Sequence, residues 1–296
     1  MTDTTTRPSG TFQLGGREVA RIGYGAMSLE RYEDDRESGV ALLRQVAELG
    51  VDHIDSADFY GRSVSNDILR RAFGDTDSVA IVTKVGAVRS DGPTPIALAQ
   101  RPEDLRAQVE DNLRSLGRSR IDVVNLRRPE VGPGLRLPED EIPDLDDQLA
   151  ELIALRDEGL IGGIGLSAVR TETVRRALPA GIVCVQNAYS LLNREFEDTL
   201  ALCVAEGVAW VPFFPLGSGF PQFPKVADDP EVRRVAAETG TSPAQVGLAW
   251  LLAHAPNTLL IPGTASVAHL EENVAAGSVA LTPAHLAALD AVAPTE

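Results

Sequence analysis

The sequence has little of what marks a membrane, secreted or nucleic-acid-binding protein. No apolar stretch reaches the length needed to span a membrane. Residues 1–8 lack the apolar core of a secretory signal peptide. The chain of 296 residues carries a formal net charge of −16, and its lysines and arginines form no basic block. We therefore expect no bulk attraction to nucleic acid or to an anionic membrane, so any anionic ligand needs a local site.

Cysteine is also scarce. Cys184 and Cys203 are too few for a disulfide framework. Both lie in apolar or helix-like runs, where a free cysteine behaves as a small hydrophobe. We therefore predict two buried free thiols, a cytoplasmic location and no metal site.

Short apolar runs alternate with amphipathic stretches along most of the chain. The expected strands are 19–25, 51–55, 79–84, 121–126, 161–166, 182–187, 208–213 and 258–262. The expected helices between them are 36–49, 65–73, 102–116, 144–158, 171–178, 195–206, 242–254 and 266–275. The strand runs are almost continuously apolar, which is typical of parallel strands covered on both faces. Eight such repeats predict an α/β fold of the (β/α)8 or TIM-barrel type.

A doubly wound open sheet is the alternative fold. It is less favoured because Gly23-Tyr24-Gly25 is not followed by a glycine-rich dinucleotide fingerprint. Beyond the eight repeats, we predict an N-terminal β-hairpin over 11–20, with Gly15-Gly16 as its turn, and an extra C-terminal helix over 281–293. Residues 1–10 are expected to be disordered and 11–296 to form a single domain. The loops 89–100, 129–143 and 219–230 are expected to be irregular lids over the barrel mouth.

Polar side chains follow the ends of three consecutive predicted strands. Asp55 and Tyr60 come after the second strand, Lys84 after the third and Arg127 after the fourth. Because chemistry in such barrels gathers at the carboxyl ends of the strands, we expect these residues to lie together. A Lys84 ammonium, held charged by Asp55, would lower the pKa of Tyr60 and make it a usable acid. The triplet suggests an enzyme that protonates a carbonyl oxygen, although a rim tyrosine beside a structural Lys–Asp pair would show the same pattern.

The order of these motifs resembles the aldo-keto reductase family over nearly the whole chain. The resemblance lies in the N-terminal hairpin, Asp55 to Gly61, Thr83 to Gly86, Leu105-Arg106 through Leu116-Gly117, Ile164 to Ser167, Gln186 to Ser190, Pro215 to Gly217, and Ile261 through Asn273. It implies a (β/α)8 barrel with a nicotinamide cofactor, usually NADPH. It also implies that Asp55, Tyr60 and Lys84 are catalytic.

At the fourth catalytic position of the family, a histidine is replaced here by Arg127. The variant resembles a bacterial branch of the family that includes pyridoxal reductases. One interpretation keeps Arg127 in the site, donating to the substrate oxygen or to an anionic substituent. Another turns it into a salt bridge with Asp122 or Glu130. Either way, a histidine-based proton relay is excluded.

The same resemblance implies a set of cofactor-binding positions. Ser167 and Gln186 would hold the carboxamide, and Phe213 would stack on the nicotinamide ring, although core packing is the alternative for Phe213-Phe214. The further positions are Leu216, Gly217 and Ser218 for the diphosphate, Gly263 and Thr264 for a second phosphate region, and His269, Glu272 and Asn273 at the adenosine end.

Three further replacements bear on the cofactor. Gly263 and His269 stand where members that prefer NADPH often have lysine and arginine, so the 2′-phosphate would depend on Thr264 and His269, with Arg233 or Arg234 nearby. Ala168 replaces a common asparagine. NADPH is still expected, and NADH is not excluded.

Three functions compete at this point. The first is an NADPH-dependent carbonyl reductase acting on a small-molecule aldehyde or ketone, with pyridoxal as the first substrate to test. The second is a nicotinamide-binding protein with a sensing or scaffold role and little turnover, favoured by the lost histidine. The third uses Lys84 as a Schiff-base amine, which requires an unpaired, desolvated lysine. The sequence predicts neither the substrate nor the oligomeric state.

Overall fold

A curled sheet of parallel strands forms the centre of the protein. The computed structural model describes residues 7, 9–92, 96–132, 137, 142–218 and 223–294. Within them, seven parallel strands follow the order β11-β10-β9-β8-β5-β4-β3. Their bounds are β3 Tyr24–Gly25, β4 His53–Asp55, β5 Ala80–Val85, β8 Ile121–Arg127, β9 Ile161–Ser167, β10 Ile182–Gln186 and β11 Ala209–Trp210.

The predicted strand 258–262 closes this sheet into a barrel. On one side Leu259 N–H donates to Trp210 O (2.8 Å), next to β11. On the other side Gly23 N–H donates to Leu260 O (2.7 Å), next to β3. This segment makes only isolated parallel bridges, yet it occupies the eighth position of the ring. The predicted (β/α)8 barrel is confirmed.

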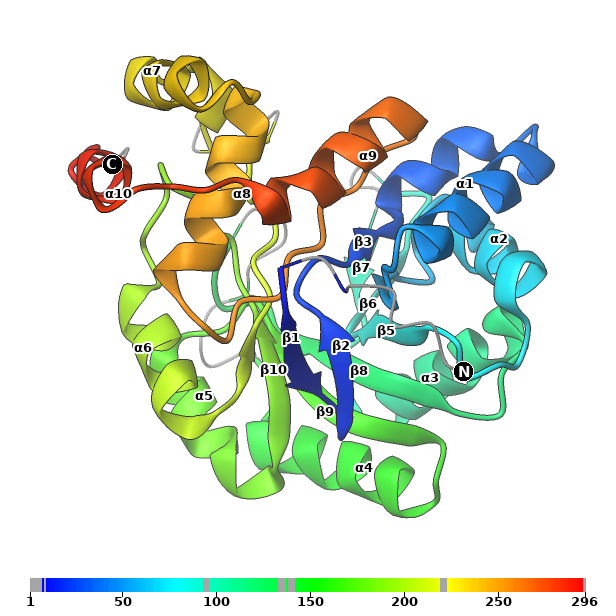
Figure 1. Ribbon diagram of the computed structural model, residues 1–296. Coiled ribbons are helices and arrows are strands. Elements are labelled where there is room, and N and C mark those ends of the chain that lie inside the picture. The colour runs from blue at the N-terminus through cyan, green and yellow to red at the C-terminus, as the bar shows by residue number, and fades with distance from the viewer. Residues whose placement is uncertain are drawn as a thin grey trace.

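Helices surround the barrel (Figure 1). Their bounds are α1 Arg36–Glu48, α2 Val64–Phe73, α3 Pro102–Leu116, α4 Leu145–Asp157, α5 Thr171–Ala177, α6 Glu197–Glu206, α7 Pro230–Thr239, α8 Pro243–His254, α9 Val267–Ala275 and α10 Pro283–Asp290, with 3-10 turns η1 Ala26–Tyr32, η3 Leu178–Ala180, η4 Val226–Asp228 and η5 Ala276–Ser278. Every predicted helix is present, including the extra one as α10. Helix α7 was not predicted, since it buries only Val232, Val235 and Ala236. No helix in the described ranges is long and apolar enough to cross a membrane.

The N-terminal hairpin fills one end of the barrel. Strands β1 (Thr11–Leu14) and β2 (Arg17–Ala20) pair antiparallel, as predicted. Leu14 and Val19 of the hairpin pack in one cluster with inward-facing residues of the barrel strands. In Figure 1 the hairpin lies in front of the strands, within the ring of helices. The prediction of one strand over 19–25 was wrong, because its first residues belong to the hairpin and its last to β3.

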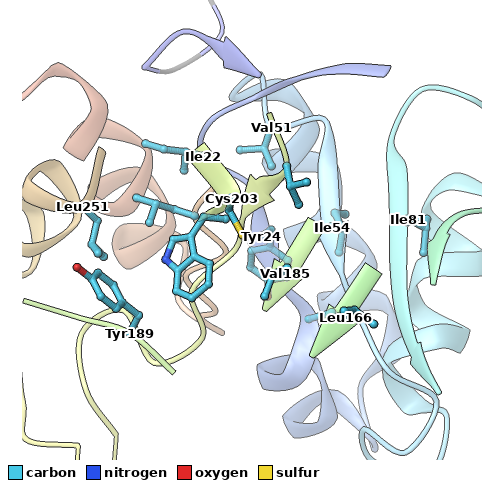
Figure 2. Close-up of a cluster of buried hydrophobic side chains, with 14 of the residues drawn as sticks. Ile22, Tyr24, Val51, Ile54, Ile81, Leu166, Val185, Tyr189, Cys203 and Leu251 are labelled. Carbon is cyan, nitrogen blue, oxygen red and sulfur yellow. The ribbon is translucent and has the colours of Figure 1, made fainter. Parts of the chain in front are cut away.

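The main core lies between the outer face of the strands and the helices. Figure 2 shows Tyr24, Ile54, Ile81, Leu166 and Val185, from five different strands, gathered in it. Both tryptophans, Trp210 and Trp250, are fully buried there. Cys184 and Cys203 are buried free thiols, as predicted.

Two of the three loops predicted to be irregular contain regular structure, since the loop 219–230 includes the 3-10 turn η4. Strands β6 (Ala87–Arg89) and β7 (Ile96–Leu98) form a second antiparallel hairpin where 89–100 was expected to be irregular. In the other two loops, residues 133–136, 138–141 and 219–222 lie outside the described residues. The predicted disorder of 1–10 also falls largely outside them and stays a prediction.

The two turn glycines of the first hairpin allow a test of how closely it packs on the barrel. Both have positive φ, +61° at Gly15 and +80° at Gly16. A Cβ on Gly15 would lie 2.8 Å from Val123 Cγ2, whereas one on Gly16 would meet nothing within 4 Å. We predict that Gly16→Ala costs about 1 kcal/mol of unfolding free energy through φ alone, and that Gly15→Ala costs about 1–3 kcal/mol more. Denaturant unfolding of both variants measures this, and equal losses would contradict the contact.

Candidate active site

The last inward-facing residues of the strands form a ring at the carboxyl end of the barrel. Successive residues of a strand point to opposite faces, so positions two apart share a face. Val82, Val123 and Cys184 pack on the hairpin inside the barrel. Residues two or four positions later therefore also face inward. The strand register pairs Gly25 with Asp55, Arg127 with Ser167, and Ser167 with Gln186. This ring consists of Gly25, Asp55, Lys84, Arg127, Ser167 and Gln186.

Asp55, Lys84 and Tyr60 are in direct contact, as the sequence predicted. Lys84 Nζ donates to Asp55 Oδ2 (2.5 Å), to the carbonyl oxygen of Ser56 (3.0 Å) and to the Tyr60 hydroxyl (3.2 Å). Asp55 is 3% and Lys84 7% exposed, while Tyr60 is half-buried. The three ammonium hydrogens of Lys84 are thus all used. Because the Tyr60 oxygen accepts from Lys84, its own hydrogen can be donated elsewhere.

The pKa of Tyr60 differs in direction from the prediction. Burial raises the pKa of Tyr60 and the Asp55 carboxylate adds to the rise, while Lys84 and Arg127 oppose it. The net pKa is above that of a free phenol, because loss of solvation outweighs the two cations. At neutral pH Tyr60 therefore carries its proton. Lys84 and Arg127 lower the free energy of the Tyr60 phenolate, but the neutral phenol is still the form present at neutral pH.

The pKa of Lys84 bears on the Schiff-base hypothesis. Burial by itself lowers the pKa of Lys84, but the Asp55 carboxylate and the Tyr60 hydroxyl outweigh it and raise the pKa above its usual value. An amine that attacks a carbonyl must be unprotonated. The paired ammonium at this position is the opposite arrangement, so the geometry does not favour an aldolase.

Gln186 contacts Asp55 in a way that the sequence did not predict. Its Nε2 donates to the second oxygen of Asp55, Oδ1 (2.6 Å). Its Oε1 is buried and has no hydrogen-bond partner among the described residues. A buried orphan acceptor is costly unless a ligand or water supplies a donor. An amide N–H of a nicotinamide carboxamide fits that requirement, so the residue fits the predicted contact with the cofactor while also orienting Asp55.

Arg127 lies beside Tyr60 at the barrel mouth. Burial lowers the pKa of Arg127 and the neighbouring Tyr60 raises it, so the two side chains interact electrostatically. The two carboxylates considered as alternative partners are engaged elsewhere: Asp122 pairs with Arg118 (3.5 Å) and Glu130 with Arg128. The proximity of Arg127 to Tyr60 supports the interpretation that keeps Arg127 in the site.

Ser167 is the last residue of β9 and belongs to this ring, and Ala168 follows it. Ser167 is 3% exposed and lies between Arg127 and Gln186 in the sheet. Ala168 has φ +56°, in the left-handed region that asparagine adopts more readily than alanine. The loss of the common asparagine therefore carries a small backbone cost as well as a lost polar group.

The predicted aromatic and diphosphate positions lie on one loop after β11. Phe213 and Phe214 are both half-buried and pack edge to face, with ring centroids 5.1 Å apart. The N–H groups of Gly217 and Ser218 donate to carbonyl oxygens of Phe214 and Phe223, within the loop itself. Gly217 is needed here because its φ is +84° and a Cβ would lie 2.1 Å from Pro224 O. The conformation of the turn therefore already requires glycine here, in addition to the close approach of a phosphate that the sequence suggested.

The predicted second phosphate region, Gly263 and Thr264, lies just before α9, and the predicted adenosine end, His269, Glu272 and Asn273, lies on α9 itself. Thr264 is nearly buried, and its carbonyl accepts from Tyr24 OH (2.6 Å). A Cβ on Gly263 would lie 2.7 Å from Gly25 O, so the lysine that NADPH-preferring aldo-keto reductases often have at this position would not fit without a shift of the backbone. His269 is exposed, and Glu272 and Asn273 are half-buried.

The arginines expected near a 2′-phosphate are held elsewhere. Arg233 pairs with Asp228 (2.6 Å), and Arg234 pairs with Glu231 (2.6 Å) and Glu238. Their guanidinium groups are thus engaged by carboxylates of their own segment. The phosphate end of the site would depend on Thr264 and His269, with hydroxyl and imidazole donors instead of a permanent cation.

A buried histidine that the sequence analysis did not single out lies below the ring. His53 precedes Asp55 by two residues on β4 and is 1% exposed. Neither ring nitrogen has a hydrogen-bond partner among the described residues, and the imidazole packs against Gly23. Burial lowers the pKa of His53 to about 4. The sequence could have shown His53, because it is an ionisable residue two positions before Asp55 on the same strand. The apolar residues around it suggested only a place in the hydrophobic core.

A closed (β/α)8 barrel with a carboxylate, an ammonium and a phenol in contact at its carboxyl mouth has the architecture of a barrel oxidoreductase. The sequence pattern of the Aldo/keto reductase family matches residues 21–294. Pyridoxine 4-dehydrogenase of Escherichia coli (strain K12) is 43% identical over 291 residues, covering 96% of this chain and 98% of that protein. An uncharacterized oxidoreductase of Schizosaccharomyces pombe is 36% identical over 290 residues, covering 95% and 89%.

A solved structure gives the same result. An aldo/keto reductase from Klebsiella pneumoniae, in complex with NADP and acetate, superposes with a TM-score of 0.79 at 25% identity, covering 97% of this chain and 96% of that one. The chain belongs to the aldo/keto reductase family. It is an NAD(P)H-dependent oxidoreductase that acts on carbonyl or CH–OH groups.

The low pKa of His53 predicts how stability depends on pH. The folded state binds this proton with a pKa of about 4, and the ordinary histidine value is 6.5. As the pH falls below 6.5 the unfolded chain takes up the proton first, so stability present above 6.5 is lost toward pH 4. The loss through this group is roughly 3 kcal/mol. We predict that His53→Gln, measured by urea unfolding between neutral pH and pH 4, has a shallower pH dependence by about that amount; a wild-type slope would contradict it.

Proposed function

We propose that the chain is an NADPH-dependent carbonyl reductase in which Tyr60 is the general acid. The observation that carries this is the contact of the Tyr60 hydroxyl with Lys84 Nζ, which is itself paired with Asp55. NADPH, when bound, supplies the hydride that reaches the carbonyl carbon. Tyr60 donates its proton to the carbonyl oxygen, so an aldehyde or ketone becomes an alcohol and Tyr60 becomes a phenolate.

Lys84 and Asp55 assist the transfer of the Tyr60 proton. With all three hydrogens of Lys84 engaged, the ammonium stays directed at the phenol oxygen and stabilises the phenolate left after transfer. Asp55 keeps Lys84 charged, and Gln186 fixes the orientation of Asp55. In the oxidation direction the same phenolate would take the proton from an alcohol. General acid catalysis of this kind contributes about 10²- to 10⁴-fold.

The cofactor would lie across the mouth, held by Ser167 and Gln186 at the nicotinamide and by the loop 216–218 and the start of α9 at the phosphates. The Klebsiella pneumoniae structure with NADP supports the choice of cofactor. The absence of a permanent cation at positions 263 and 269 suggests that NADPH is preferred over NADH by a small factor only.

Arg127 would hold the substrate. A guanidinium donates two parallel hydrogen bonds and cannot accept a proton, so it suits an oxygen or a phenolate on the substrate. Pyridoxal has a phenolate beside its aldehyde. The Escherichia coli relative is named pyridoxine 4-dehydrogenase, which makes pyridoxal the first carbonyl compound to test.

Turnover of NADPH with a panel of aldehydes, pyridoxal included, tests this function. We expect NADPH oxidation by the wild type, and a loss of kcat of about 10²- to 10⁴-fold in Tyr60→Phe with NADPH binding retained, since only the proton donor is removed. Tyr189→Phe is the control, because it removes the hydroxyl of another buried tyrosine, which donates to Glu197 on α6. Tight NADPH binding by the wild type without turnover of any carbonyl would instead favour the sensing or scaffold role.

A further inference from the structure

A buried polar network lies behind the candidate site, between the barrel wall and two helices. Its centre is Asn66 on α2 and Asn112 on α3, which are 0% and 1% exposed. Asn66 Nδ2 donates to Ser115 Oγ (2.9 Å) and to Asn112 Oδ1 (3.2 Å). Two adjacent buried asparagines on different helices are costly unless their amides are satisfied, so the network specifies how α2 and α3 pack.

The network reaches the chain neighbours of both members of the ion pair. Ser56, which follows Asp55, donates from Oγ to Asn66 Oδ1 (2.8 Å). Thr83, which precedes Lys84, donates from Oγ1 to Asn112 Oδ1 (2.6 Å). Both hydroxyl residues are 0% exposed. Thr83 faces outward because Lys84 faces into the barrel.

The same network holds the loop that carries Tyr60. Asp58 Oδ1 accepts from Ser63 Oγ (2.8 Å) and Ser115 Oγ (2.8 Å), and Asn66 Nδ2 lies 3.3 Å from it. Tyr60 thus lies between two residues, Asp58 and Ser63, that are tied to each other and to the helices. These hydrogen bonds stabilise a strained turn, because residues 61–63 have φ of +56°, +53° and +64°.

We propose that Asn66 and Asn112 are positioning residues that hold Tyr60 against Lys84. The proposal rests on the proposed function of Tyr60 as general acid. Through one set of hydrogen bonds, the two amides link the chain neighbours of Asp55 and Tyr60, at the end of β4 and in the loop after it, to the chain neighbour of Lys84 on β5. They touch none of the reacting atoms, so their effect on the reaction passes through the positions of Tyr60, Lys84 and Asp55 relative to one another.

The direction of each hydrogen bond explains why amides fit these positions. The hydroxyls of Ser56 and Thr83 donate to amide oxygens, and the amide nitrogen of Asn66 donates onward to Ser115 and Asn112. A carboxylate could accept from the hydroxyls but could not donate onward. An aspartate at position 66 would also add a second negative charge beside Asp58.

Asn66→Ala tests the proposal, with NADPH oxidation and hydrogen exchange of residues 57–63 measured on the full-length protein. We expect faster exchange in that segment. We also expect kcat to fall by about tenfold to 10²-fold, the size of effect that a misplaced catalytic group produces. The KM for NADPH is expected to stay within about twofold, because the cofactor positions lie on other strands. Wild-type kcat despite faster exchange would overturn the proposal.

Thr83→Val and Thr83→Ser keep the test decisive if Asn66→Ala does not fold. Thr83→Val removes only the hydroxyl and is expected to lower kcat in the same sense, while Thr83→Ser retains it and is expected to restore kcat. Thr199→Val is the matched control, since Thr199 is also 0% exposed and bonds another threonine hydroxyl, Thr171, on the far helices. It is expected to keep wild-type kcat. Equal kcat in Thr83→Val and Thr83→Ser would count against the network.

Failure of the proposed function is distinguishable from failure of this inference. If the wild type turns over no carbonyl, the proposed function fails. Hydrogen exchange then shows whether the two amides hold the loop. Faster exchange of residues 57–63 in Asn66→Ala but not in Thr199→Val supports the inference, and unchanged exchange in Asn66→Ala overturns it.

Discussion

The ion pair between Asp55 and Lys84 is the interaction on which the site depends. Both side chains are buried, and an isolated charge in that position would cost several kcal/mol or shift to its neutral form. Both have hydrogen-bond partners: Lys84 donates to Asp55, Ser56 and Tyr60, and Asp55 accepts from Lys84 and Gln186. Because these hydrogen bonds fix the position of the Lys84 ammonium, they also fix the position of the Tyr60 hydroxyl that accepts from it.

The barrel makes this arrangement possible. Its strands bring residues from separate segments to one mouth, while the hairpin of β1 and β2 fills the opposite end with apolar side chains. Outside the wall, the amides of Asn66 and Asn112 link the end of β4 and the loop after it to β5. The inner face of the barrel sheet therefore carries the candidate reactive groups, and its outer face carries the hydrogen bonds that fix the residues next to them in the chain.

Much of this architecture could be predicted from the sequence, because runs such as 121–126 and 161–166 are apolar and end in polar residues. The convergence of Asp55, Tyr60 and Lys84 followed from the fold alone. Other features depend on tertiary surroundings that no local pattern reports. The net pKa of Tyr60 follows from burial outweighing two cations, the bond from Gln186 to Asp55 joins residues far apart in the chain, and Gly263 reflects the close approach of Gly25. The roles of the individual site residues and the single-domain boundary at residue 11 stay predictions.

The central claim is that the Lys84 ammonium serves the proton transfer of Tyr60. The most direct measurement is kcat for carbonyl reduction by Lys84→Met, together with its dissociation constant for NADPH from fluorescence titration. The account predicts that kcat falls by about 10²- to 10⁴-fold, because the phenolate loses its stabilising cation, while the dissociation constant changes little. A Lys84→Met protein that binds NADPH and reduces carbonyl compounds at the wild-type rate would contradict it.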